Sequence, residues 1–154
     1  MATINATLNI SSSDLTSSSF SLSKSMTMTK AGTNTGLEFS SGLVRRKLTA
    51  TTEIDLVPTG AQVYGTPTAS SSGAAGKLYI KNTGSSTTDF ISVALGDATG
   101  AEELDDGTSK ITLGKLYGGE WMIIPYHGAT NVGDVLVAPS TAEATTIEWM
   151  LFFE

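Results

Sequence analysis

The feature that most constrains the fold is a two-residue alternation of apolar and polar side chains. It is clear in residues 4–10, 20–29 and 145–153, and Ile147, Trp149 and Leu151 mark one side of the last segment. This spacing indicates a β-strand with one buried face, because successive side chains leave a strand on opposite sides. No helical segment is long enough for a parallel βαβ crossover. The sequence therefore predicts an all-β protein with antiparallel sheets.

Further short apolar runs are separated by clusters of Pro, Gly, Ser and Asn, which favour turns. They predict strands within 37–48, 52–57, 62–64, 77–81, 88–95, 111–113, 120–124 and 134–137. The runs at 77–81 and 88–95 are expected to form a hairpin around the turn cluster 82–86. Pro125 is expected to end its strand or to lie on a sheet edge. Many short strands joined by turns are typical of an antiparallel β-sandwich or a jelly roll.

The chain divides by composition into two parts within one domain. Residues 1–36 are rich in Ser and Thr and cannot easily form a hydrophobic core alone. They are therefore expected to be an extended N-terminal β segment or arm. Residues 37–154 are expected to form the sandwich. Lys24 interrupts the apolar side of the arm, so this side is expected to lie on a partner, with the ammonium group reaching solvent.

Composition excludes several classes of function. The 154 residues contain no cysteine, which rules out a disulfide scaffold, thiol catalysis and Cys-ligated metals. The net charge of −6 disfavours direct nucleic-acid binding. No run approaches the roughly 20 apolar residues of a membrane helix, and residues 1–10 do not resemble a signal peptide. We therefore expect a chain made in the cytoplasm, without a membrane partner.

Motifs for catalysis are weak. His127 is the only histidine, it is expected in a loop, and no G-x-S-x-G elbow accompanies it. Glu120 and Glu148 are on separate predicted strands without a sign of a shared cleft. The run 73–77 resembles the end of a phosphate loop but lacks its Ser/Thr and its helix. We predict no enzyme, no catalytic residues and no cofactor.

Two charged clusters leave alternatives open. The acidic loop 97–106 lacks the register of a calcium loop and is expected to be solvated, although calcium between subunits remains an alternative. The triplet Arg45-Arg46-Lys47 is the only basic cluster. It is either a solvated strand end or a contact with an acidic surface on a neighbouring protein. We predict no metal ligands.

The apolar side of the arm supplies the candidate assembly residues. Phe20, Leu22, Met26 and Met28 recur at a spacing of two, and methionine adapts to irregular surfaces. They are either an ordinary core strand or a surface that docks on another subunit. Together with the triplet 45–47, they are the predicted assembly interface.

Three segments resemble a known family. Leu78–Gly84 (LYIKNTG), Gly114–Pro125 (GKLYGGEWMIIP) and Thr145–Leu151 (TTIEWML) look like strands of small virion structural proteins of tailed bacteriophages, especially phages of cyanobacteria and other aquatic bacteria. Segments 21–30 and 42–52 resemble the family more weakly. The resemblance covers about two-thirds of the chain, and its motifs are structural.

The resemblance implies a location and partners. The expected function is that of a capsid decoration (cement) protein of jelly-roll type, which stabilises the shell by protein–protein contacts within the virion. The expected partners are the major capsid protein and copies of the same chain, as a homotrimer. The resemblance leaves open a component of the tail, baseplate or fibre, and a receptor- or glycan-binding module.

Overall fold

The structure is a computed structural model that describes residues 4–13, 20–29, 37, 39–49, 53–57, 75–96, 110–127, 134–141 and 145–153. These residues form strands and turns, with no helix long and apolar enough to cross a membrane among them. The strands are β1 (Asn5–Ser12), β2 (Phe20–Thr27), β3 (Phe39–Ser40), β4 (Val44–Leu48), β5 (Ile54–Val57), β6 (Ala75–Asn82), β7 (Phe90–Gly96), β8 (Lys110–Tyr117), β9 (Trp121–His127), β10 (Asp134–Pro139) and β11 (Thr145–Phe153).

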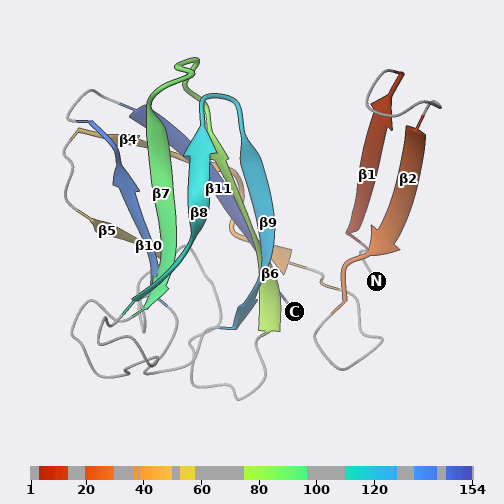
Figure 1. Cartoon of the computed structure of the whole chain (residues 1–154). Helices are drawn as coiled ribbons and strands as arrows, with labels where there is room; N and C mark the ends of the chain where they lie inside the picture. The colour runs from red at the N-terminus through yellow and green to blue at the C-terminus, as the bar shows by residue number, and fades with distance from the viewer. Residues whose placement is uncertain are drawn as a thin grey trace.

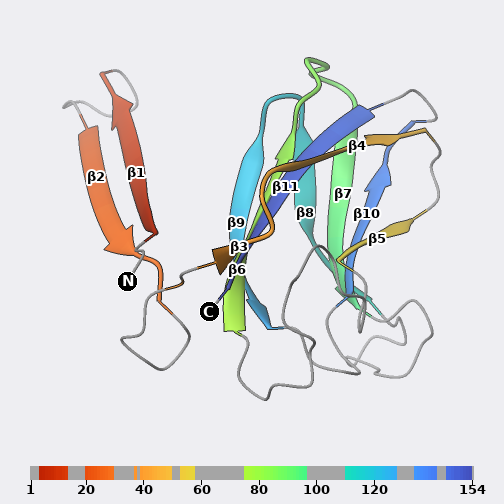
Figure 2. The same cartoon turned by 180° about the vertical axis from the view of Figure 1, so that it is seen from behind.

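Two antiparallel sheets form a sandwich, and a separate hairpin stands beside it (Figures 1 and 2). One sheet has the order β5-β10-β7-β8. The other has the order β3-β11-β6-β9, with β4 also paired to β11. Strands β1 and β2 pair only with each other within the described residues. The predicted all-β, antiparallel sandwich is confirmed.

Strands β4 to β11 form nested pairs. The innermost pair is β7–β8, followed outward along the chain by β6–β9, β5–β10 and β4–β11. The predicted hairpin between 77–81 and 88–95 is wrong. These segments are β6 and β7, which lie in different sheets, so the turn between them crosses from one sheet to the other.

The core lies between the two sheets and is built from alternate residues of the strands. In β11 the inward residues Ile147, Trp149 and Leu151 are at most 5% exposed, as their alternation predicts. They pack with Leu48, Leu56, Leu78, Ile80, Ile91, Val93, Leu116, Val135 and Val137. Burying each large side chain contributes roughly 1.5–3 kcal/mol, so this layer holds the sheets together.

The β8–β9 turn fixes the start of β9. Gly119 has a φ of 85°, a left-handed conformation that suits glycine, and its N–H donates to the Asn82 carbonyl at 3.0 Å. The buried Asn82 side chain donates from Nδ2 to the Leu116 carbonyl at 3.0 Å and accepts from the Gly84 N–H at 2.9 Å. Asn82 therefore joins β6 in one sheet to β8 in the other.

Strand β9 is longer than predicted. Pro125 lies inside it, and His127, expected in a loop, is its last residue. A proline is tolerated here because β9 is an edge strand, the second of the two expectations for this residue. The strand predicted at 62–64 lies outside the described residues.

Candidate functional site

The hairpin has one apolar and one polar side. Its register pairs Ala6 with Met26, Leu8 with Lys24 and Ile10 with Leu22, which places these side chains on the same side. We call this side the hairpin face; it comprises Ala6, Leu8, Ile10, Phe20, Leu22, Lys24 and Met26. Four of its large apolar side chains are exposed, from 42% at Leu8 to 54% at Met26. A two-stranded hairpin has no core of its own, so this face is left without cover.

The opposite side of the hairpin carries a ladder of hydrogen bonds. Ser23 donates to Asn9 at 2.5 Å and Thr27 donates to Asn5 at 3.0 Å. The hydroxyls of Thr7 and Ser25 lie 3.2 Å apart, between these two pairs. Cross-strand pairs of this kind hold the register, so the apolar residues stay on one side.

The base of the hairpin is anchored to the chain that follows. The Met28 N–H donates to the Ile4 carbonyl at 2.8 Å, and the Leu37 N–H donates to the Met28 carbonyl at 3.0 Å. Met28 is 3% exposed and Leu37 is fully buried. Burial at this point anchors the base of the hairpin, and the strands β1 and β2 stand beside the sandwich on the side of β9 (Figure 1).

The sandwich presents an apolar surface to the hairpin. Residues Met122 and Ile124 of β9 pack against the core, so Trp121 and Ile123 point out of the sheet. Trp121 is 52% exposed and Ile123 is 38% exposed. The Trp121 ring lies 6.4 Å from the ring of Tyr79 on β6, at an interplanar angle of 40°. The outer face of the sheet therefore carries a partly exposed aromatic and apolar patch around Trp121.

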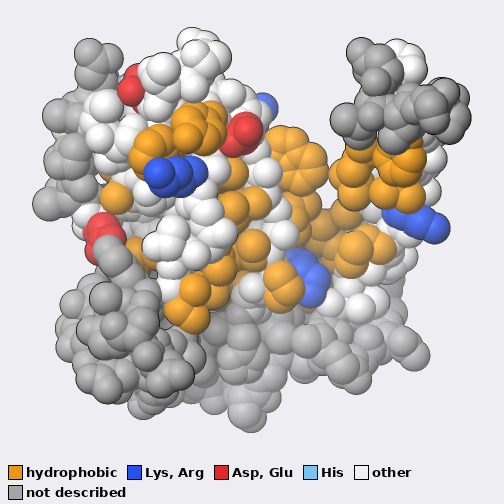
Figure 3. Space-filling view, viewed as in Figure 1, with side chains coloured by type: hydrophobic (Ala, Val, Ile, Leu, Met, Phe, Trp, Pro, Cys, Tyr) orange, Lys and Arg blue, Asp and Glu red, His pale blue; other side chains and the backbone are white. Residues whose placement is uncertain are grey.

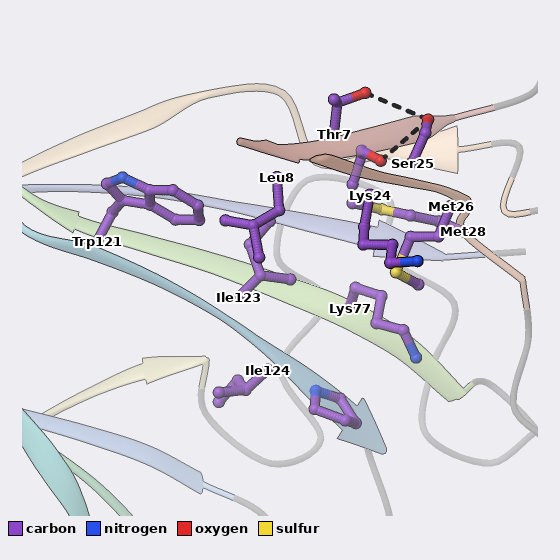
Figure 4. Close-up of a pocket in the computed structure, with 12 residues that line it drawn as sticks. Thr7, Leu8, Lys24, Ser25, Met26, Met28, Lys77, Trp121, Ile123 and Ile124 are labelled. Carbon is purple, nitrogen blue, oxygen red and sulfur yellow. Dashed lines mark hydrogen bonds between the residues drawn. The ribbon is translucent and has the colours of Figure 1, made fainter. Parts of the chain in front are cut away.

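A groove of about 510 Å³ separates the hairpin from this patch. Figure 3 shows apolar side chains on both of its walls, and in Figure 4 Leu8 points toward Ile123. The lining residues are Ala6, Thr7, Leu8, Lys24, Ser25, Met26 and Met28 on the hairpin side and Lys77, Trp121, Ile123, Ile124 and Pro125 on the sandwich side. The volume is within the range of small-molecule binding sites, about 300–1,000 Å³.

The charged side chains that line the groove are both cations. Lys24 comes from the hairpin and Lys77 from β6, and no carboxylate is among the lining residues that the structure describes. Figure 4 shows both side chains reaching toward the end of the groove near Met28. The groove is therefore apolar with a positive end.

A carboxylate is buried elsewhere on the same outer face. Glu148 of β11 is 7% exposed, faces Arg45 and Lys81 in the register, and accepts from Arg45 Nε at 2.5 Å. Partial burial raises the pKa of the nearby Tyr79 hydroxyl above its usual value, and the charge of Glu148 adds to the effect. This cluster is a structural ion pair between β4 and β11, on the same face of the sheet but away from the groove along β9.

The predicted assembly residues are separated by the structure. Phe20, Leu22 and Met26 lie together on the hairpin face, whereas Met28 is buried at its base. The triplet 45–47 is on β4, which pairs with β11 at the edge opposite to β9. The hairpin residues and the triplet therefore belong to different surfaces.

Sequence reasoning missed the sandwich wall of the groove. The sequence places Trp121 and Ile123 within a strand, and Lys77 at the start of a strand and at the end of the phosphate-loop-like run 73–77, without indicating a groove. The signal was the run Trp121–Ile124, in which both sides of the strand are apolar. Such a strand needs cover on both faces, and among the described residues no sheet is packed on the second face.

Other candidate sites are not brought together. The acidic loop 97–106 lies outside the described residues. Within those residues, no group of three His, Asp or Glu side chains is placed to hold a metal ion. No family model, no curated protein and no solved structure matches the chain.

Proposed function

We propose that this protein is a structural component of a tailed-phage virion, a capsid decoration protein that stabilises the shell by contacts with coat subunits and with its own copies. The location and the homotrimer follow from the sequence resemblance. The contact mechanism follows from the surfaces described above. No catalytic step is part of the proposal.

The strand order supports this class of protein. The nested pairs β4–β11, β5–β10, β6–β9 and β7–β8, distributed over the two sheets of the sandwich, are the pairing that a jelly roll would be expected to have. This fold is frequent in viral capsid proteins, and it also occurs in lectins. The fold by itself does not select the function.

The observation that carries the proposal is the hairpin face. Leu8, Ile10, Phe20 and Met26 are each more than 40% exposed on an element that cannot bury them itself. Contiguous exposed apolar residues mark surfaces that bind other proteins. A projecting hairpin is well suited to reach a neighbouring subunit, as a decoration protein requires.

The test is rebinding to particles from which the protein has been removed with a chaotrope. Electron cryomicroscopy should show many copies of the wild-type chain over the shell. Phe20→Asp should lose incorporation, because it places a charge on the hairpin face. Ser21→Asp, on the polar side of the same strand, should bind normally. Copies only at one vertex would instead identify a tail, baseplate or fibre component, and absence from the particle would reject the virion role.

A glycan-binding module is the second candidate, and one observation favours it. Trp121 is half-exposed beside Tyr79, so an aromatic surface is open for stacking on a sugar ring. Glycan-array binding that disappears in Trp121→Ala but persists in Phe20→Asp would support this role over decoration.

A further inference from the structure

We propose that the groove receives an extended, apolar segment of another protein subunit, and that a carboxylate on this segment pairs with Lys24 and Lys77. This inference rests on the proposed assembly function and names the chemistry of the partner. It concerns the space between the hairpin and β9, whereas the decoration role requires only that the hairpin face binds a subunit.

The shape of the groove selects an extended segment. Its walls are β1 and β2 on one side and β9 on the other, and the hairpin runs alongside β9 in both views (Figures 1 and 2). β9 is an edge strand that pairs only with β6 in the described part of the chain. An edge strand offers backbone donors and acceptors to an added strand, while side chains specify the partner.

The apolar walls select side chains that can fill the space between them. Leu8 and Met26 line one wall, and Trp121 and Ile123 line the other. All four are at least 38% exposed, so the present structure leaves them in contact with solvent. A segment placed between the walls would be covered on both sides, and would therefore be apolar on both sides.

The lysines select a negative charge. Lys24 and Lys77 come from opposite walls, and within the described part of the chain no carboxylate lines the groove to balance them. Covering two ammonium groups with apolar side chains is unfavourable unless an anion accompanies them. One carboxylate near Met28 would offset the repulsion between the lysines and connect the hairpin to the sandwich. This accounts for a lysine in the middle of an otherwise apolar face.

The experiment uses the full chain and a pair of labelled synthetic peptides. In one peptide, valine and threonine alternate around two central aspartates. The control peptide, its twin, is identical except that asparagines replace the two aspartates. Fluorescence anisotropy should show that the aspartate peptide binds about tenfold more tightly, the preference of a charge-assisted hydrogen bond. The preference should vanish in the double variant Lys24→Gln/Lys77→Gln. It should remain in Lys115→Gln, which removes an exposed lysine of β8, a strand of the other sheet that does not line the groove.

A second readout places the peptide. Trp121 is half-exposed whereas Trp149 is 3% exposed, so a covered groove should shift the tryptophan emission to shorter wavelength through Trp121. The shift should be absent in Trp121→Phe. Circular dichroism, together with the emission of Trp149, checks that each variant is folded.

The possible outcomes separate the two proposals. Equal binding of the twins, a preference that survives the double variant, or no binding would overturn the acidic-segment inference. Binding of dodecanoate with loss of Trp121 exposure, without peptide binding, would also overturn it and identify a site for an anionic lipid. If the peptides fail while Phe20→Asp still blocks incorporation into particles, the decoration role stands and only the groove inference falls.

Discussion

Arg45 holds the buried carboxylate of Glu148 through two nitrogens, Nε and Nη2, each 2.5 Å from the same Oε1 atom. The Arg45 side chain is 70% exposed, so water can solvate its charge, whereas the Glu148 side chain is only 10% exposed. The carboxylate therefore relies on the ion pair more than the guanidinium does. Lys81 lies directly opposite Glu148 on β6 and supplies a second positive charge. The pair connects the edge strand β4 to the centre of its sheet.

Replacing Arg45 by methionine should destabilise the fold by about 1–3 kcal/mol, because it removes a hydrogen bond and the ion pair from a buried carboxylate. Urea unfolding measures the loss. Lys47→Met changes an exposed residue on the same strand and is the matched control, with an expected effect within about 0.5 kcal/mol. Glu148→Gln should cost less than Arg45→Met, since an amide needs no counter-charge. Equal losses for Arg45→Met and Lys47→Met would contradict this role for the pair.

Stability should fall at high pH partly through Tyr79. Its pKa is raised above 10.0 by burial and by Glu148, so above pH 10 the unfolded chain loses this proton before the folded chain does. The contribution is complete below pH 10 and is lost as the pH rises through the folded-state pKa. Unfolding free energies measured across this range should therefore decline less steeply in Tyr79→Phe.

The cause of the shift can be tested separately. Glu148→Gln removes the negative charge and should lower the pKa of Tyr79 in a spectrophotometric titration, with Tyr79→Phe identifying its signal. Because burial is the larger cause, part of the shift should remain. An unchanged titration in Glu148→Gln would mean that the carboxylate does not influence the hydroxyl.

Gly118 should tolerate no side chain. A Cβ at this position would lie 2.6 Å from the Ser86 carbonyl oxygen and 2.8 Å from that of Gly84, both backbone atoms. Gly118→Ala should lower the free energy of unfolding by about 1–3 kcal/mol, the usual cost of overpacking. Gly114→Ala is the control, because no atom lies within 4 Å of the added Cβ. Thermal melting should separate the two variants clearly.

Asn82 should be the most sensitive polar residue between the sheets. Asn82→Asp replaces the Nδ2 donor with an acceptor facing the Leu116 carbonyl, and at 1% exposure water cannot compensate. We expect a loss of about 1–3 kcal/mol or more from the unfolding free energy. Thr83→Ala removes an exposed hydrogen bond to Thr146 and should cost less. Similar losses in both variants would show that the link between sheets is unimportant.

Much of the fold follows from side-chain alternation. Alternation locates the strands at 4–10, 20–27 and 145–153 and the inward side chains Ile147, Trp149 and Leu151. It does so because neighbouring side chains leave a strand on opposite sides, which decides locally which of them is exposed. Alternation does not say which strands pair. The segments that became β6 and β7 looked like a hairpin because a turn joins them, yet each pairs with strands from later in the chain.

The sequence indicates the hairpin side of the candidate site but not its sandwich side. Phe20, Leu22 and Met26 stood out because their neighbours are Ser and Thr. Lys77 and Trp121 did not, because their role depends on a hairpin about fifty to a hundred residues earlier in the chain. In the sequence Glu148 is notable only as a possible partner of Glu120, since its actual partner, Arg45, is 103 positions away. Long-range proximity of this kind is a property of the topology, not of any local pattern.

Nested pairing has a consequence for how the chain folds. We expect the innermost ribbon, β7 with β8, to close at the smallest loss of chain entropy, because its loop is the shortest of the four nested pairs. Pairing of β4 with β11 should cost more, because Arg45 and Glu148 are 103 residues apart. The β1–β2 hairpin is outside this sequence of events and forms from neighbouring residues. A subunit could therefore complete its sandwich while its hairpin is still free to engage a partner during assembly.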